Sequence, residues 1–214
     1  MSNVIETESP RSGDVPPAQV IDAAERIADS YADYLSDESR YGPSSADMLV
    51  LSHDEAQVAV ELAAAAADGR DVTVSAGRTG IVGGAVPGSG VLLSLERMNR
   101  IRGVTRLRDG RYSVRVDPGV SVAELRRRLE RKELDIAEDD LRETGPADLT
   151  AFLEDERSFF YPPDPTEDTA HIGATVATNA SGARSFRYGA TRRHVVAVRL
   201  CLTTGGVIAV RRGD

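Results

Sequence analysis

The chain has 214 residues, enough to bury a hydrophobic core and to form one domain or two small ones. Hydrophobic residues make up 41% of it and charged residues 28%, so most of the chain should fold. Its formal net charge of −8 argues against a protein that binds nucleic acid through its overall charge. The single cysteine, Cys201, excludes an internal disulfide, and its apolar surroundings favour a buried, inert thiol over a nucleophile.

Residues 1–17 are polar and acidic and lack the apolar stretch of a signal peptide, so they are predicted to be a disordered tail. Residues 18–46 are predicted to form an N-terminal helix and a connection, because apolar residues recur at helical spacing over 18–35. No apolar run is long enough to cross a bilayer, and we expect a soluble, cytoplasmic protein.

Residues 47–105 are predicted to form a first subdomain of α/β type. Strands are expected at 47–51, 72–75 and 91–95, and a helix should follow the capping-box pair Ser52 and Glu55. Strand, helix and strand with short connections imply a parallel pair joined by a right-handed crossover.

Residues 106–214 are predicted to form a second subdomain of mixed helix and strand. Its expected elements are a strand at 112–116, a helix capped by Ser121 with Glu124, an acidic insertion at 133–158, a helix rich in small residues at 171–180, and a hairpin of 195–203 with 207–210.

The stretch "SAGRTGIVGG", residues 75–84, raises the question of what must approach its backbone so closely. A P-loop requires a lysine, and none lies nearby. A dinucleotide fingerprint runs into a helix, whereas these glycines lead into a predicted strand. Two interpretations remain, an anion-binding nest of backbone N–H groups and an ordinary flexible loop.

The surroundings of this loop carry a resemblance to a known family. "TVSAGRTGIVGGAVP" followed by "VLLSLERMNRI" resembles the first FAD-binding segment of the vanillyl-alcohol oxidase and p-cresol methylhydroxylase (PCMH-type) superfamily. The nearest branch is the glycolate oxidase subunit and D-lactate dehydrogenase group. Three further stretches agree, in chain order: "YLSDESR" at 34–40, "VDPGVSVAELRRRL" at 116–129 and "YPPDPTEDTAHIGATVATNASGARSFRYGATRRHV" at 161–195.

The resemblance implies an α+β fold, the PCMH-type FAD-binding fold of two subdomains, at residues 47–214 with FAD extended between the subdomains. It also implies that the fold is truncated before its C-terminal segment and cap domain. Because the catalytic base and the substrate-binding groups of the family lie in those missing parts, we assign no catalytic residue.

The resemblance assigns a first set of cofactor-binding residues, whose backbone N–H groups should wrap the FAD pyrophosphate: Ala76, Gly77, Arg78, Thr79, Gly80, Gly83 and Gly84. Relatives usually carry glycine at positions 76 and 78. An arginine in a left-handed backbone would cost roughly 1–2 kcal/mol. Either the backbone at Arg78 is ordinary, which we favour, or its guanidinium offsets the strain by pairing with a phosphate.

A second set should contact the flavin ring and the ribityl chain: Pro163, Asp164, His171, Ile172, Gly173, Ala174, Thr175, Asn179, Ala180, Gly182, Tyr188 and Gly189. A helix that begins with small residues lets its N–H groups reach the ring and the phosphates. His171 stands where relatives usually have serine or threonine, so a hydrogen bond near the ring and a plain surface position are equally open.

The resemblance implies a flavin-dependent dehydrogenase acting on a small 2-hydroxy acid such as D-lactate or glycolate, with hydride transfer from the substrate α-carbon to flavin N5. The three histidines, His53, His171 and His194, lie outside the glycine loop, so FAD is expected to be non-covalent. They also lack metal-site spacing. The alternative is a non-catalytic FAD-fold remnant or an interaction subunit that another polypeptide completes.

Overall fold

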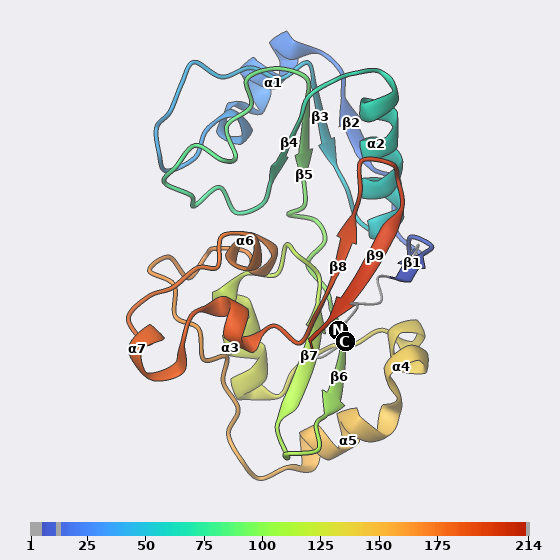
Figure 1. Ribbon diagram of the computed structural model, residues 1–214, viewed down its shortest axis with the longest axis vertical. Coiled ribbons are helices and arrows are strands. Elements are labelled where there is room, and N and C mark those ends of the chain that lie inside the picture. The colour runs from blue at the N-terminus through green and yellow to red at the C-terminus, as the bar shows by residue number, and fades with distance from the viewer. Residues whose placement is uncertain (1–5, 12–13, 213–214) are drawn as a thin grey trace. The chain divides into compact units, whose positions relative to one another are not determined.

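The computed structural model describes residues 6–11 and 14–212, and it divides into two compact units (Figure 1). Unit 1 takes the chain up to Met98 together with the chain from Val195 onward, and unit 2 spans Asn99 to His194. The expected boundary at 105/106 therefore falls within unit 2. The C-terminal hairpin belongs to unit 1 because it packs against a helix of that unit.

Unit 1 is built on a four-stranded sheet with the order β2-β3-β5-β4. The strands are β2 (Gln19–Ile21), β3 (Met48–Leu51), β4 (Val72–Ser75) and β5 (Val91–Ser94). Both β3 and β4 run parallel to β5, which confirms the predicted parallel arrangement. The two are not neighbours, however, because β5 lies between them. All four residues of β5 are buried, as expected of a central strand covered on both faces.

Helix α2 (Glu55–Ala67) covers this sheet, and its N-cap differs from the predicted one. Asp54 caps the helix by accepting a hydrogen bond from the Gln57 N–H at 2.9 Å, whereas Ser52 is fully buried at the end of β3. The capping pattern therefore predicted the helix but placed its start two residues early. Val58 and Leu62 pack in the same core cluster as residues of β3 and β5.

The expected helix over 18–35 is three elements in the structure: β2, α1 (Ala24–Ser30) and a 3₁₀ helix (Ala32–Leu35). Val20 is exposed and Ile21 is buried, and this alternation suits the edge strand that pairs antiparallel with β3. Helical spacing and strand alternation are hard to tell apart in so short a run, which explains the error.

The described part of the N-terminal 17 residues is anchored, which corrects the expectation of a disordered tail there. Strand β1 (Glu6–Glu8) pairs antiparallel with β9 (Val207–Arg211). The carbonyls of Arg11 and Pro16 accept hydrogen bonds from the first turn of α2. Strand pairing uses backbone groups that any composition supplies, so a polar segment could join the sheet. Residues 1–5 and 12–13 lie outside the described residues.

The predicted C-terminal hairpin is confirmed as β8 (Ala197–Cys201) and β9, with Gly205 in the turn at a φ of +79°. With β1 it forms a sheet in the order β1-β9-β8. Arg199 of β8 lies 2.7 Å from Glu55 of α2 and also pairs with Glu8 of β1. This one guanidinium joins the hairpin, the helix and the N-terminal strand.

Unit 2 contains an antiparallel pair, β6 (Ile101–Arg106) and β7 (Tyr112–Val116), and the helix α3 (Val122–Arg131). The predicted cap of α3 is confirmed, because the Ser121 hydroxyl accepts from the Glu124 N–H at 3.1 Å. Hydrogen bonds from Arg127 and Arg128 hold the pKa of the Glu124 carboxyl at about 2. The remaining elements are α6 (Ile172–Ala177), α7 (Ser185–Tyr188) and a 3₁₀ helix (Thr191–His194).

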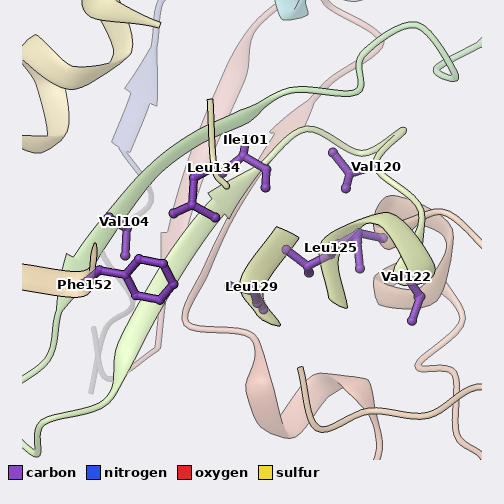
Figure 2. Packing of buried hydrophobic residues seen from close by; sticks show 9 residues of the cluster. Ile101, Val104, Val120, Val122, Leu125, Leu129, Leu134 and Phe152 are labelled. Carbon is purple, nitrogen blue, oxygen red and sulfur yellow. The ribbon is translucent and has the colours of Figure 1, made fainter. Parts of the chain in front are cut away.

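The acidic segment 133–158 is a packed part of unit 2, formed largely by α4 (Glu138–Thr144) and α5 (Pro146–Glu154). Phe152 is fully buried in the core cluster that Figure 2 shows beside β6 and β7. Asp140 of α4 lies 3.4 Å from Arg102 and 3.3 Å from Arg115, which belong to that strand pair. Arg115 also pairs with Glu143, so two acidic residues of α4 are matched by arginines of the strand pair. Among the described residues, no helix has the length and apolar content required to span a membrane.

Replacing Phe152 with alanine should lower the free energy of unfolding by about 3–5 kcal/mol, because it empties a core position. Leu153→Ala on the same helix is the matched control. That leucine is 46% exposed, so its loss should cost less than about 1 kcal/mol. Urea unfolding followed by far-ultraviolet circular dichroism measures both, and equal costs would contradict the packing of α5.

Cys201 should behave as an unreactive thiol, since burial raises its pKa to about 11. The thiolate is the reactive form, so near neutral pH the native protein should react slowly with a disulfide reagent. Unfolding in urea should speed the reaction at least about tenfold, because the exposed thiol returns toward an ordinary pKa. An equally fast reaction in the native state would contradict this.

Candidate functional site

The glycine loop leaves the carboxyl end of β4 and returns to the start of β5. In open parallel sheets this edge is where ligands bind. Ser75 and Ser94 are register partners that end β4 and β5, and Ser52 follows β3, so three buried serines stand in a row there. The loop residues from Ala76 to Thr79 are half-buried, and Gly80 and Gly84 are exposed.

Some glycines of this loop are required by the protein itself. Gly83 has a φ of +74°, a left-handed conformation that favours glycine. Gly90 has a φ of +71°, and a Cβ there would overlap the Asp71 carbonyl oxygen.

Gly80 and Gly84 have no such explanation, because neither has a left-handed φ. A Cβ at Gly84 would meet nothing within 4 Å, and one at Gly80 would meet only an Asp37 oxygen, at 3.7 Å. A missing side chain in open space at both positions is what the close approach of a bound molecule requires. The cradle therefore fits the pyrophosphate expected from the resemblance.

Arg78 does not have the ordinary backbone that the sequence favoured, since its φ is +54°. Its guanidinium lies 4.4 Å from the centre of the Tyr34 ring and 3.1 Å from the Glu96 carboxylate. It also donates to the Ala76 carbonyl at 3.3 Å. The cost of a left-handed arginine, about 1–2 kcal/mol, is thus offset by contacts within the chain.

The turn that follows Tyr34 supports the loop from one side. The Glu38 N–H donates to the Arg78 carbonyl at 3.3 Å, and a Cβ at Gly83 would touch the Tyr41 side chain at 3.3 Å. Asp37 is 9% exposed, and its Oδ1 accepts from the Ser39 N–H at 2.9 Å. These contacts give a role to the stretch "YLSDESR".

Tyr34 and Glu96 both contact Arg78 of the candidate site, and sequence reasoning singled out neither of them. The Tyr34 hydroxyl donates to the Glu96 carboxylate, and burial, with this bond, raises the tyrosine pKa to about 12. The matching stretch at 34–40 was a signal that this segment belongs to the site. Nothing in the sequence indicated that Glu96 would pair with Arg78.

The second predicted set gathers on the N-terminal side of α3 within unit 2. Asp164 pairs with Arg126 of α3 and lies 3.4 Å from Arg184. An isolated antiparallel bridge joins Pro165 to Gly182, and another joins Ser121 to His171. The structure therefore brings 163–165, 171–175 and 179–184 into one region.

Two glycines of this set are explained by packing inside unit 2. A Cβ at Gly173 would lie 2.5 Å from the Pro118 Cβ, and one at Gly182 would overlap the Asp164 carbonyl oxygen. The N–H groups of Ile172 and Gly173 donate to the carbonyls of Val120 and Pro118 at 2.8 and 2.9 Å. The role expected of these two amides, to reach the ring, is therefore not available in this conformation.

Other members of the set contact the 3₁₀ helix at Thr191–His194 or belong to α7. Asn179 has a φ of +50°, and its side-chain oxygen accepts from the Arg192 N–H at 3.0 Å. The Ala180 carbonyl accepts from both the N–H and the hydroxyl of Thr191. Tyr188 packs edge-on against Phe160 at 5.6 Å between ring centres, in keeping with a shaping role.

The fold is that of PCMH-type FAD oxidases, and the match to the family below gives FAD as the cofactor. Residues 46–139 and 147–211 match the family described as the FAD binding domain, and the chain belongs to that family. The unmatched residues 140–146 fall at the junction of α4 and α5, inside the predicted insertion.

Similar proteins include two D-lactate dehydrogenases. The protein from Anaerostipes hadrus is 33% identical over 178 residues, which cover 82% of this chain and 32% of that protein. The protein from Archaeoglobus fulgidus is 31% identical over 140 residues, covering 65% and 25%. The glycolate oxidase subunit GlcD of Bacillus subtilis is 28% identical over 132 residues, covering 61% and 22%. The chain spans a third or less of these relatives.

Solved structures share the fold at low sequence identity. An alkyldihydroxyacetonephosphate synthase superposes with a TM-score of 0.66 at 20% identity, covering 92% of this chain and 33% of that one. A chitooligosaccharide oxidase gives a TM-score of 0.65 at 15% identity, covering 92% and 35%.

Substitution by alanine should distinguish glycines that the packing of the protein requires from glycines that face open space in the loop. Gly182→Ala should destabilise the protein by about 1–3 kcal/mol, because its Cβ overlaps backbone that cannot turn away. Gly84→Ala should change the free energy of unfolding by less than about 0.5 kcal/mol, since its Cβ enters open space. Thermal unfolding of the cofactor-free protein measures both, and a large loss in Gly84→Ala would contradict the cradle.

Proposed function

We propose that the chain is the FAD-binding part of a dehydrogenase that oxidises a small 2-hydroxy acid such as D-lactate or glycolate. The observation that carries the cofactor assignment is the pair Gly80 and Gly84, whose bare backbone the fold itself does not require. The substrate class is supported by the names of the similar proteins, two of which are D-lactate dehydrogenases.

The first segment would bind the pyrophosphate with the backbone amides of 76–80 and 83–84 and with the Thr79 hydroxyl. Backbone N–H groups suit this task because they need no counter-charge of their own. The Arg78 guanidinium is already paired with Glu96, so the phosphate charge would be met by peptide dipoles.

The second segment would position the flavin half of the cofactor with Pro163, Asp164, residues 171–175 and 179–182, and Tyr188 with Gly189, through groups other than the Ile172 and Gly173 amides, which are bonded within unit 2. When bound, FAD supplies at N5 the acceptor for a hydride from the substrate α-carbon. The chain's own contribution is to hold the cofactor in one orientation.

FAD would be held without a covalent link. None of the three histidines lies in the glycine loop: His53 precedes α2, His171 precedes α6, and the His194 ring lies 3.0 Å from the Tyr188 carbonyl oxygen. Cys201 lies on β8 with a raised pKa, which leaves little thiolate for attachment.

A second candidate is a non-catalytic FAD-fold subunit that another polypeptide completes. The observation in its favour is the apolar surface at β8, the last strand in the order β1-β9-β8, where Leu200 and Leu202 are 45% and 37% exposed. Such a surface suits a partner of apolar character. A dye that binds apolar surface should then fluoresce with the isolated chain and less with Leu200→Ser.

The decisive test is the visible spectrum of the purified chain after added FAD and gel filtration. A retained flavin spectrum is expected, and acid precipitation should release all the flavin. Reduction of that spectrum by D-lactate or glycolate, once the chain is joined to the substrate-binding part that the resemblance implies, would separate the dehydrogenase from the non-catalytic subunit. A colourless protein would contradict FAD binding, and colour in the acid pellet would contradict non-covalent attachment.

The cradle itself can be tested with a matched pair of glycines. Gly84→Ala should weaken FAD binding about tenfold or more, because its Cβ holds the phosphate off. Gly88→Ala is the control, since Gly88 also faces open space with an ordinary φ but lies outside the proposed cradle. Quenching of flavin fluorescence measures both affinities, and equal losses would argue against the assigned segment.

A further inference from the structure

The side chain of Arg78, in the glycine loop, meets those of Glu96 and Tyr34 from two other segments of unit 1, and we call these three residues the Arg78 brace. Arg78 ion-pairs with Glu96 at 3.1 Å and stacks on the Tyr34 ring at 4.4 Å, and the Tyr34 hydroxyl donates to Glu96. The side chains of Arg78 and Glu96 are only 22% and 25% exposed. Every pair in the group is therefore in contact, and solvent screens them weakly.

The brace holds the loop at its least favourable backbone position. Arg78 has a φ of +54°, a conformation that arginine adopts only when its surroundings impose it. Its guanidinium also reaches the Ala76 carbonyl at 3.3 Å, and its own carbonyl accepts from the Glu38 N–H at 3.3 Å. Residue 78 is thus fixed through both its side chain and its backbone.

We propose that Arg78 is a positioning residue that, through Glu96 and Tyr34, presets the loop 76–84 in the shape that binds the FAD pyrophosphate. This rests on the proposed function. A loop that is already shaped loses less conformational freedom when its ligand binds, so the affinity rises without a new contact. A glycine would permit the same φ but would leave the loop free to depart from it.

The alternative role, a direct phosphate ligand, requires Arg78 to leave its partners. One Arg78 nitrogen donates to both Glu96 and Ala76, and Tyr34 covers the face of the guanidinium. Swinging the group to a phosphate would leave the half-buried Glu96 carboxylate without its cation. That exchange is unfavourable, because breaking a buried ion pair leaves an uncompensated charge, and the free-energy cost of that charge exceeds the stabilisation that the pair had provided.

The two roles predict opposite effects of Glu96→Gln. If Arg78 acts through the brace, Arg78→Ala and Glu96→Gln should each weaken FAD binding about tenfold. The double variant should then be no weaker than the weaker single variant, because both changes break one unit. If Arg78 is a phosphate ligand, Glu96→Gln should leave the affinity unchanged or raise it.

The experiment measures the dissociation constants of FAD, of ADP and of FMN for the full chain. ADP carries the pyrophosphate without the flavin, so it should lose affinity in parallel with FAD, and FMN should change less than twofold. Arg78→Lys keeps the charge pair but not the flat stacking face, so it should recover part of the loss. Arg111→Ala, in an exposed pair with Asp109, is the control and should bind as the wild type does.

Each outcome decides the proposal. Parallel, non-additive losses for FAD and ADP support it, and so does partial recovery with lysine. Unchanged affinity in Arg78→Ala, or a loss confined to Arg78→Ala with Glu96→Gln unaffected, overturns the brace while leaving FAD binding in place. A wild-type chain that binds neither FAD nor ADP overturns the proposed function and the brace with it. Should Arg78→Ala fail to fold, Glu96→Gln and Arg78→Lys make the same comparison.

Discussion

The pairing of β5 between two parallel neighbours is the constraint on which the site depends. Because β3, β5 and β4 run in one direction, all three strands end at the same edge of the sheet. The loop after β4 and Glu96 after β5 are therefore neighbours, although 18 residues separate Arg78 from Glu96. The full burial of β5 suits its place between two neighbours, since each of the other three strands of this sheet has at least one residue that is not fully buried.

The glycines assigned to the site fall into two physical classes that the sequence alone does not distinguish. Gly173 and Gly182 are needed because another part of the same unit occupies the space of a side chain. No part of the chain occupies the space of a side chain at Gly80 and Gly84, so packing does not explain these two glycines. The resemblance assigned all four to the cofactor. Only the surroundings of each glycine show which of them the packing of the protein requires.

Sequence reasoning succeeded where cause and effect lie within a few residues. The cap of α3 was predictable because Ser121 and the Glu124 N–H are one helical turn apart. Strand β6 was missed because its sequence, IRGVTR, includes a glycine that weakens the strand pattern. That glycine is required by a residue remote in sequence, since a Cβ at Gly103 would overlap Thr144 of α4. The backbone conformation of Arg78 was not predicted for the same reason, because its partners Glu96 and Tyr34 are both remote in sequence. Local patterns thus located the loop and most strands, and long-range contacts decided the rest.

The pairing of β1 with β9 has a consequence for the order in which the protein can fold during synthesis. Glu6 to Glu8 leave the ribosome long before their partners, Val207 to Ala209, are made. Unit 2 is continuous in sequence, from Asn99 to His194, and is fully translated before those partners exist. Unit 1 can therefore close only after the whole of unit 2 has been made, and until then β1 stays unpaired and accessible to chaperones and to proteases.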